Sequence, residues 1–410
     1  MAEQAGPRLL ARRAAGTPAS ATAALDTDLK QLLSQGVDVI NLTAGEMDFP
    51  TPPEASHGGM TAISEGFTRY TAVPGSLALR EAIGSWLAVR HGTHYRPEEI
   101  VVSNGAKQAL FNTFSVLLDP GDEVIVPTPH WVSFPHMITI AGGVPVAVRA
   151  GSADGFKLSP RALRAHLSPR SRVLLLNNPT NPTGVVYTRA ELEALAVTAI
   201  EAGLVIVSDE IYDQLVYEPA TFVSTASLAE EVKARTVTIN GVSKTFGMTG
   251  WRIGYAAAPA PIARAMAAFQ GHTTSAPSSI SQRAAQAALS ADNLAPELER
   301  RRAELDRRRK LLISELASIP GLRPAVEPLG TFYLLAEVTG YGDASAFARD
   351  LLDSEQVGVM PAECFDAPGH VRISYVVDVA RLLEALARIR RFAKTAPERN
   401  LRVPEFGRRL

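Results

Sequence analysis

The chain of 410 residues has a single cysteine, Cys364, and a formal net charge of only −1. One cysteine cannot form an internal disulfide or a zinc–thiolate site, and this fits a reducing cytoplasm, which is the location we expect. The near-zero net charge gives no reason to expect nucleic acid or a membrane surface as a partner. No uncharged apolar run approaches the roughly 20 residues that span a bilayer.

Several common motifs are also missing. There is no G-x-G-x-x-G, Walker A or H-E-x-x-H sequence, so dinucleotide, nucleoside triphosphate and zinc-protease chemistry have no support. Residues 1–24 are rich in Ala and Arg and poor in acids, as transit peptides are, but they lack a continuous apolar stretch. We interpret them as an N-terminal arm that lies on the fold.

Short apolar runs alternate with helical patterns between about residues 99 and 260. The runs are rich in Val, Ile and Leu rather than alternating with polar residues, which is typical of strands buried on both faces. The sequence therefore predicts an α/β fold, with a mostly parallel central sheet covered by helices on both faces. The expected strands lie at residues 100–102, 123–126, 173–176, 204–207, 236–239 and 253–257.

The charge composition changes near Pro296. The following helical stretch, residues 297–316, carries two arginine-rich clusters with interleaved acids, and we interpret it as the solvated face of a connecting helix. A smaller α+β segment follows, and its last helix is expected to begin after Asp378 as N-cap. We predict an N-terminal arm with part of a small domain at 1–50, a large domain at 51–296 and a small C-terminal domain at 297–410.

Lys244 and Arg252 lie eight residues apart, between two of the expected strands. A lysine at the end of a buried strand is partly desolvated, which lowers its pKa and makes its amine nucleophilic. Such an amine forms a Schiff base with an aldehyde, and an arginine is a fixed cation suited to a phosphate. Pyridoxal 5'-phosphate (PLP) would require both. Taken alone, the pair is equally consistent with a strand-end lysine that reaches water.

Asp209 ends the apolar run 205–208, at the edge of the sheet where ligands of open α/β folds bind. Its carboxylate could hold a pyridine nitrogen protonated, which makes the ring an electron sink. Tyr212 follows by three residues, so on a helical turn its side chain faces the same way. The alternative is that Asp209 caps a helix and that Tyr212 is a core aromatic.

Four further positions suit a bound ring and its phosphate. Asn181 lies in the rigid, proline-containing loop 177–184, which could hold its amide against a phenolate oxygen. Gly105 and Ala106 join a strand to a helix, where free N–H groups attract a phosphate. Trp131 could stack on a flat ring. A plain turn, an ordinary strand–helix connection and a core indole are the corresponding alternatives.

Arg372 lies in a short C-terminal strand, residues 370–375, and shares one strand face with Ser374. An inward-facing arginine requires an anion, and a substrate α-carboxylate fits its bidentate fork. An ordinary salt bridge is the alternative.

Taken together, these residues resemble the class I aminotransferases of PLP-dependent fold type I, most of all the bacterial aspartate/prephenate aminotransferase subgroup. The resemblance extends from about Ser20 to Phe392. The matching stretches are 42–46 with 48–49, Arg69-Tyr70, 105–110, 181–184, 208–212, Ser243-Lys244, 248–255 and the strand with Arg372.

The resemblance implies a role for each matching residue. Lys244 would bind PLP covalently and carry the proton, Asp209 would pair with the pyridinium, and Tyr212 and Asn181 would donate to the phenolate oxygen. The phosphate would be held by Arg252, by Gly105 and Ala106, and by Tyr70 of a partner subunit, which implies a homodimer. Trp131 would stack on the ring, and Arg372 with Gly45 would hold the substrate carboxylate.

The sequence gives the fewest indications about which substrates the protein prefers. In the acidic-substrate subgroup, the positions of Lys107 and Thr22 help to receive a distal carboxylate, so we expect aspartate, glutamate, prephenate or another dicarboxylate as one partner. Met47, His130 and Leu329 depart from the relatives' pattern and are expected near the substrate pocket. An oxidase, cyclase or eliminase of the same fold stays open as an alternative. A PLP-sensing module would require an appended DNA-binding domain, for which 410 residues leave no room.

Overall fold

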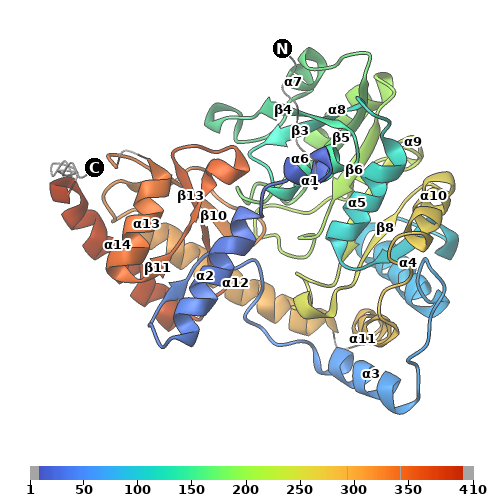
Figure 1. Cartoon of the computed structure of the whole chain (residues 1–410), viewed down its shortest axis with the longest axis horizontal. Helices are drawn as coiled ribbons and strands as arrows, with labels where there is room; N and C mark the ends of the chain where they lie inside the picture. The colour runs from blue at the N-terminus through green and yellow to red at the C-terminus, as the bar shows by residue number, and fades with distance from the viewer. Residues whose placement is uncertain (1–8, 293, 342, 400–410) are drawn as a thin grey trace.

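A seven-stranded sheet forms the centre of the larger part of the molecule in a computed structural model that describes residues 9–292, 294–341 and 343–399 (Figure 1). The strand order is β2-β8-β7-β6-β5-β3-β4. Strands β3 to β7 run parallel, and β8 is antiparallel to both of its neighbours. The strands are β2 (Ile100–Ser103), β3 (Glu123–Thr128), β4 (Val144–Arg149), β5 (Ser171–Asn177), β6 (Val205–Asp209), β7 (Thr236–Gly241) and β8 (Gly254–Ala257).

This sheet confirms the predicted α/β fold class and all six expected strands. The sequence pattern missed one strand, β4, which is the edge strand next to β3. Most residues of β4 are partly or fully exposed, and Pro145 lies within it. Residues 144–148 are all apolar, but a proline argues against a central strand and is tolerated at an edge, where only one side of the strand pairs with a neighbour.

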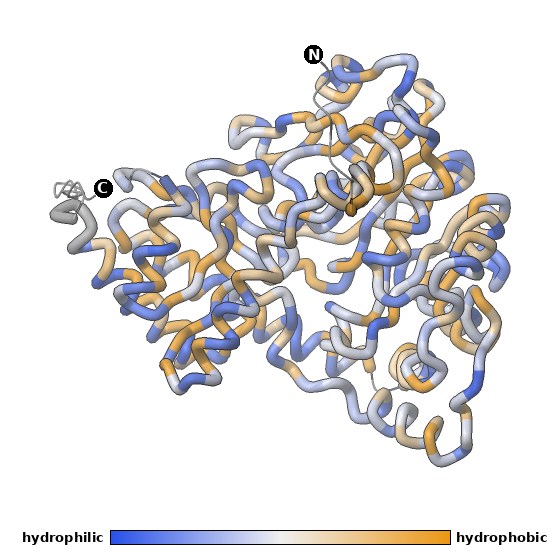
Figure 2. Tube along the Cα trace, in the orientation of Figure 1, coloured by the Kyte–Doolittle hydropathy of each residue, from blue (hydrophilic) through white to orange (hydrophobic). Residues whose placement is uncertain are grey.

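Helices bury both faces of the sheet. Helices α5 (Ala106–Leu117), α6 (Ser133–Ile140) and α10 (Ala260–Gly271) pack their apolar residues against one face. Helices α4 (Leu77–His91) and α8 (Arg189–Glu201) pack against the other. Hydrophobic and hydrophilic positions alternate along these helices in Figure 2, as expected when one side of each helix faces the core. None of the helices within the described ranges has the length and apolar character of a membrane span.

The smaller part contains a four-stranded antiparallel sheet in the order β12-β13-β10-β9. The two-residue strand β1 (Ile40–Asn41), near the N-terminus, pairs with β11 (Val357–Gly358). The last helix follows Asp378, whose side chain accepts a hydrogen bond from the Arg381 N–H at 3.0 Å, so the expected N-cap is confirmed. The remaining elements of this part are β9 (Leu322–Pro324), β10 (Tyr333–Val338), β12 (Met360–Pro361), β13 (His370–Ser374), α2 (Ala21–Ser34), α12 (Leu294–Leu316), α13 (Ala344–Glu355) and α14 (Val379–Arg399).

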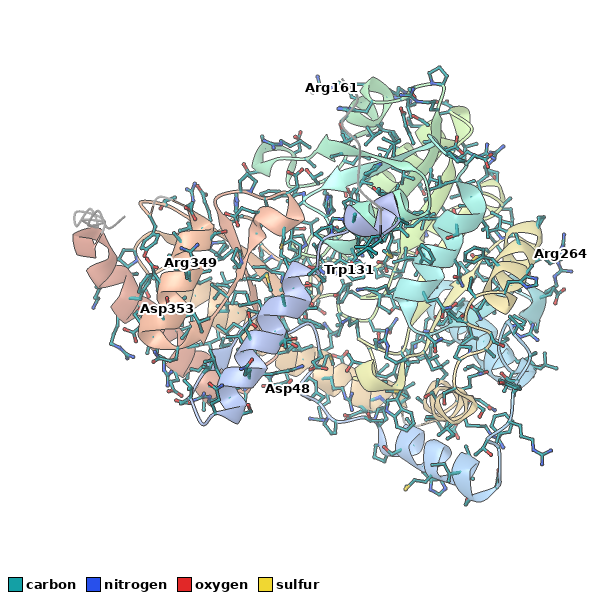
Figure 3. The ribbon with its side chains drawn as sticks, in the orientation of Figure 1. Asp48, Trp131, Arg161, Arg264, Arg349 and Asp353 are labelled. Carbon is teal, nitrogen blue, oxygen red and sulfur yellow. The ribbon has the colours of Figure 1, made fainter. Side chains whose placement is uncertain are left out.

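Helix α12 corrects one prediction. Its arginines are not all on a solvated face, because Arg301, Arg308 and Arg309 are only 2%, 4% and 2% exposed. Arg308 bonds Asp48 at 2.8 Å, on a loop that precedes the large sheet in the sequence. Figure 3 labels Asp48 at this junction, close to α12. The buried side of this helix therefore carries charged side chains, and each of the three buried arginines forms an ion pair with a carboxylate.

Candidate active site

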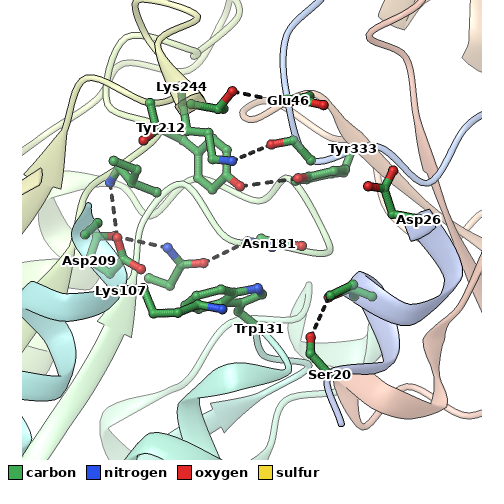
Figure 4. A pocket seen from close by; sticks show the side chains of 18 of the residues that line it. Ser20, Asp26, Glu46, Lys107, Trp131, Asn181, Asp209, Tyr212, Lys244 and Tyr333 are labelled. Atoms are coloured by element: carbon green, nitrogen blue, oxygen red, sulfur yellow. Dashed lines mark hydrogen bonds between the residues drawn. The ribbon is translucent and has the colours of Figure 1, made fainter. Parts of the chain in front are cut away.

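A pocket of about 390 Å³ opens at the carboxyl ends of β5, β6 and β7, where open α/β sheets bind ligands. The N-terminus of α5, helix α2 and strand β13 complete its walls. In Figure 4, Lys244 and Tyr212 lie opposite Trp131, with Asp209 at one end of the space and Asp26 on α2 at the other. The lining residues include nearly all those expected, namely Thr22, Gly45, Ala106, Lys107, Trp131, Asn181, Asp209, Tyr212, Lys244, Arg252 and Arg372.

Lys244 follows β7 and points its amine into this pocket. The side chain is half-buried, and its Nζ donates a hydrogen bond to the Gly45 carbonyl. Burial lowers the pKa of Lys244, and the Arg252 and Arg372 cations act in the same direction. The amine therefore loses its proton more easily than an ordinary lysine, which is what a nucleophilic or basic role requires.

Asp209 ends β6 with its side chain only 4% exposed. Burial raises the pKa of Asp209 to about 7, despite a hydrogen bond from the Ile211 N–H and the nearby Lys244 cation. Among the described residues, no cation lies within ion-pair distance of it. A buried carboxylate of this kind is costly when charged, so it favours a cationic ligand atom beside it.

Tyr212 and Asn181 line the pocket from the loops that follow β6 and β5. Tyr212 is 4% exposed, and its hydroxyl lies 3.5 Å from that of Tyr333. Burial raises the pKa of Tyr212 well above its usual value, so the hydroxyl stays protonated and can donate a hydrogen bond. The loop with Asn181 is fixed by the Asn177 side chain, which accepts the Asn181 N–H at 2.8 Å.

The turn between β2 and α5 packs tightly against Arg252. Gly105 has a φ of +80°, and a Cβ there would lie 2.3 Å from Nη2 of Arg252. A Cβ on Gly254 would lie 2.2 Å from the Ala106 nitrogen. Among the described residues, Arg252 donates to the Thr249 and Asn104 carbonyls, at 2.9 and 3.3 Å, and forms no ion pair. An arginine without an acid beside the first amides of a helix is arranged to receive an anion.

Trp131 forms the opposite wall with its half-buried ring. The Nζ of Lys107 lies 4.9 Å from the centre of that ring. Desolvation lowers the pKa of Lys107, and the cations Arg252 and Lys244 lower it further. The crowding of three cations around one pocket favours ligands with more than one negative charge.

Arg372 is 3% exposed on β13, stacked between the rings of Tyr333 and Phe365 at 4.0 and 4.8 Å. It donates to Asn181 Oδ1 at 3.1 Å and to the Thr43 carbonyl at 2.9 Å. Its Nε–H has no hydrogen-bond partner, and no carboxylate in the described part of the chain pairs with it. A buried cation without an anion is costly unless a ligand supplies one.

Four residues named from the sequence are not among those that line the pocket. Tyr70 is 97% exposed, and it does not line the pocket of its own subunit. Met47, His130 and Leu329 do not themselves line the pocket, although Met47 follows the lining residue Glu46 and His130 precedes the lining residue Trp131. Met47 is part of the core around α12, and His130 lines a small neighbouring cavity behind Trp131.

Sequence reasoning missed four lining residues with ionisable side chains: Asp26, Lys30, Glu46 and Tyr333. Asp26 and Lys30 are spaced i, i+4 on α2, four and eight residues after Thr22, so they follow Thr22 on the same helix face. Tyr333 pairs with Ser374 in the antiparallel ladder that carries Arg372. Helix periodicity gave a usable signal for the first two, whereas the β10–β13 register was not predictable.

The fold and the set of charged groups at the sheet edge define the class of protein, which is an enzyme of PLP-dependent fold type I. The family model described as "Aminotransferase class I and II" matches residues 37–389. The chain belongs to this family, and it is a PLP-dependent aminotransferase.

Relatives and solved structures agree with the family. An aspartate aminotransferase of Geobacillus stearothermophilus is 44% identical, over 93% of this chain and 98% of its own length. An aspartate/prephenate aminotransferase of Thermus thermophilus is 41% identical, over 94% and 98%. A solved Thermus thermophilus aspartate aminotransferase with maleate superimposes with a TM-score of 0.90 at 41% identity, covering 94% of this chain and 100% of that one.

Proposed function

We propose that this aminotransferase moves an amino group between an L-amino acid and a 2-oxo acid, with a dicarboxylate such as aspartate, glutamate or prephenate as one partner. The observation that carries the proposal is Arg372, a buried cation that borders the pocket without an acid partner. The relatives named aspartate or aspartate/prephenate aminotransferase support the acidic partner.

The residues present fit PLP. Asp209 would pair with the ring nitrogen, Tyr212 and Asn181 would face the ring oxygen, and Trp131 would cover one ring face. The phosphate would lie at Arg252 and the first amides of α5, a turn so close-packed that no Cβ fits at Gly105. When no substrate is bound, Lys244 would hold the cofactor covalently.

Bound PLP supplies an aldehyde that links to amines and a ring that withdraws electrons from the substrate. The protein's own residues do the rest. Arg372 holds the substrate α-carboxylate, with Gly45 beside it, and so presents the Cα hydrogen to Lys244. The lowered pKa of Lys244 would let its amine take that proton and pass it to the carbon that was the aldehyde of the cofactor. Asp209 would keep the ring nitrogen cationic, and its burial would strengthen this pairing.

Lys107, on α5, and Thr22, on α2, would receive the distal carboxylate of an acidic substrate. Lys107 is suited to this because its flexible side chain crosses the Trp131 ring and has no acid partner among the described residues. A lysine ammonium can follow substrates of different length, which a rigid guanidinium fork cannot do.

We also propose a homodimer in which Tyr70 of each subunit reaches the other subunit's phosphate site. The full exposure of this tyrosine supports the proposal. Met60, Ile63 and Leu77, exposed apolar residues of α3 (Pro53–Ser64) and α4, extend the same region. Tyr70→Phe should weaken PLP retention, and mixed dimers should carry the defect in the opposite subunit's site. A fully active monomer would contradict this.

We further propose that the chain divides into three parts at residues 50 and 296, and that the protein is located in the cytoplasm.

The half-reaction tests the proposed chemistry. Holoenzyme is incubated with single amino acids and no oxo acid. Transamination releases one oxo acid per active site and then stops, because the amino group stays on the enzyme-bound cofactor until an oxo acid removes it. Free ammonia or oxygen consumption would instead indicate the eliminase or oxidase alternative. Aspartate and glutamate should react at lower concentrations than alanine.

A further inference from the structure

We propose that Asp26, on α2, is a positioning residue for Arg372: it fixes the segment that orients the guanidinium toward the substrate carboxylate. The inference rests on the carboxylate-binding role proposed above for Arg372. Asp26 lines the pocket near the end opposite Asp209, and its side chain is 29% exposed (Figure 4). It touches neither the cofactor site nor Arg372 directly.

A continuous path of hydrogen bonds joins the two residues. Asp26 Oδ1 accepts from Asn41 Nδ2 at 3.1 Å. Asn41 Oδ1 accepts from both the N–H and the hydroxyl of Thr43, at 2.9 and 2.7 Å. The Thr43 carbonyl then accepts from Nη2 of Arg372 at 2.9 Å. Three short steps thus connect a carboxylate on α2 to the buried guanidinium.

The chemistry of the middle residue explains why Asp26 matters. A side-chain amide presents an acceptor on one side and two donors on the other. An ionised carboxylate only accepts, so Asp26 selects the orientation in which the Asn41 NH₂ faces α2 and Oδ1 faces Thr43. The reversed amide would direct donors at the two Thr43 donors. The Thr43 backbone would then lose its support, and the carbonyl that holds Arg372 would shift.

Backbone hydrogen bonds connect the segment around Thr43 to strand β13, so a shift of this segment also moves the strand that carries Arg372. Leu42 N donates to the Gly358 carbonyl, and the Leu42 carbonyl accepts from Ser374 N at 2.8 Å, two residues from Arg372. Thr43 is 3% exposed. Arg372 has two fixed contacts, Asn181 and Thr43, so a shift of either turns its free Nε–H relative to the pocket.

A second set of contacts from Asp26 is exposed and separable. Lys30 lies 2.8 Å from Asp26 and 3.5 Å from Glu46, with side-chain exposures of 58% and 51% for Lys30 and Glu46. Exposed pairs of this kind contribute little and are screened by salt. If these ion pairs carried the effect, added salt or Lys30→Gln would reproduce it. The hydrogen-bond path through Asn41 carries no such salt dependence.

The test compares four holoenzyme variants. Asp26→Leu removes both sets of contacts at similar volume, and Asn41→Leu breaks only the path to Arg372. Asp26→Asn keeps an acceptor for Asn41, and Asp28→Asn makes the same charge change at an exposed position of α2 that lies outside the pocket. PLP absorbance and the thermal midpoint verify that each variant is folded and loaded.

We expect Asp26→Leu and Asn41→Leu to raise KM about tenfold, the worth of one hydrogen bond to a charged group, with kcat within about threefold. The rise should be the same for aspartate and alanine, because both have the α-carboxylate. Asp26→Asn should restore most of the loss, and Asp28→Asn should match the wild type.

Three results would overturn the inference: an unchanged KM in both leucine variants, a rise with aspartate alone, or an equal rise in Asp28→Asn. Its failure is distinguishable from failure of the proposed function. If only the inference about Asp26 fails, Arg372→Leu still raises KM for every amino acid and the wild type still transaminates. If the proposed function fails, Arg372→Leu itself discriminates between substrates or the half-reaction yields no oxo acid.

Discussion

Four arginines in the part of the chain that the structure describes are almost completely buried, and they differ in one respect. On α12, each of Arg301, Arg308 and Arg309 contacts a carboxylate, at 2.7 to 2.8 Å. On β13, Arg372 is equally buried, but within the described residues its hydrogen bonds go to an amide oxygen and a backbone carbonyl rather than to a carboxylate, and its Nε–H is unpartnered. The charges of the three α12 arginines are neutralised by the protein itself, whereas the charge of Arg372 requires an anion from a ligand. Burial alone therefore does not mark a functional cation, but burial without an anion does.

The same contrast separates two buried aspartates on neighbouring turns. Asp213 accepts from His91 at 2.8 Å, with both side chains 2% exposed. Burial alone would lower the pKa of His91, but the Asp213 hydrogen bond and charge outweigh it, and the pKa is raised. Asp209 has no such partner, and its own pKa is raised to about 7. We interpret Asp213 as structural and Asp209 as a ligand-binding group.

The largest effect is expected for Lys244→Ala. It should abolish turnover and the visible absorbance of covalently held cofactor, because no other lysine of the pocket follows β7. The fold should persist, since the Lys244 amine contacts only one backbone carbonyl. Steady-state assays and absorbance spectra check this, with circular dichroism as the control for folding. Near wild-type turnover would reject the assignment of the whole site.

Arg372→Leu should come next. Loss of one partner from a desolvated pair costs about 3–5 kcal/mol, which corresponds to a loss of about two to four decades in kcat/KM. The loss should be uniform across aspartate, alanine and phenylalanine, because they share the α-carboxylate. Substrate series measured on the same preparation would reveal any dependence on the side chain, and such a dependence would move Arg372 to a different role.

Asp209→Ala should lower kcat by roughly ten- to a hundredfold, or about 1.4–2.7 kcal/mol. PLP affinity should fall less, because the phosphate contacts at Arg252 and α5 remain. Its counterpart, Asp213→Ala, should mainly lower stability, since it leaves the buried His91 unpaired. Normal turnover of the Asp209→Ala variant at saturating PLP would show that Asp209, like Asp213, has only a structural role.

Lys107→Ser should have the smallest effect, about fivefold, because Lys107 is exposed at the pocket wall. The weakening should be confined to acidic substrates, and it should diminish at high salt. Equal losses for aspartate, alanine and phenylalanine would show that Lys107 does not recognise the side chain. Met47, His130 and Leu329 are then poor substitutes as determinants, because none of them lines the pocket.

The sheet and most of the pocket were predictable from the sequence for a physical reason. Strands buried on both faces are continuous apolar runs, and polar residues that directly follow such runs must converge at one edge of a parallel sheet. Lys244 and Asp209 are both of this kind, at the ends of β7 and β6. The edge strand β4 also has an apolar run, residues 144–148, but Pro145 lies within it, and a proline is atypical of a strand buried between two neighbours.

The partners of buried charges were not predictable. The arginine clusters of α12 have the composition of a solvated helix, yet Arg308 pairs with Asp48, 260 positions earlier in the chain. The path from Asp26 to Arg372 likewise joins α2 to β13 through β1, whose pairing with β11 the sequence did not indicate. The periodicity of hydrophobic residues indicates which face of a helix or strand is buried, but not which residue from a distant part of the chain contacts that face.

The most direct test of the account is one paired measurement on holoenzyme: kcat/KM and the urea midpoint of unfolding for Arg372→Leu and Arg308→Leu. Arg308→Leu leaves Asp48 without its cation, whereas Glu304 keeps Arg307, and it should lower stability by about 2–3 kcal/mol with kcat/KM within severalfold of wild type. Arg372→Leu should lower kcat/KM at least about a hundredfold with little change in the midpoint. If Arg372→Leu instead unfolded the protein and Arg308→Leu abolished activity, the distinction between paired and unpaired buried arginines would be wrong.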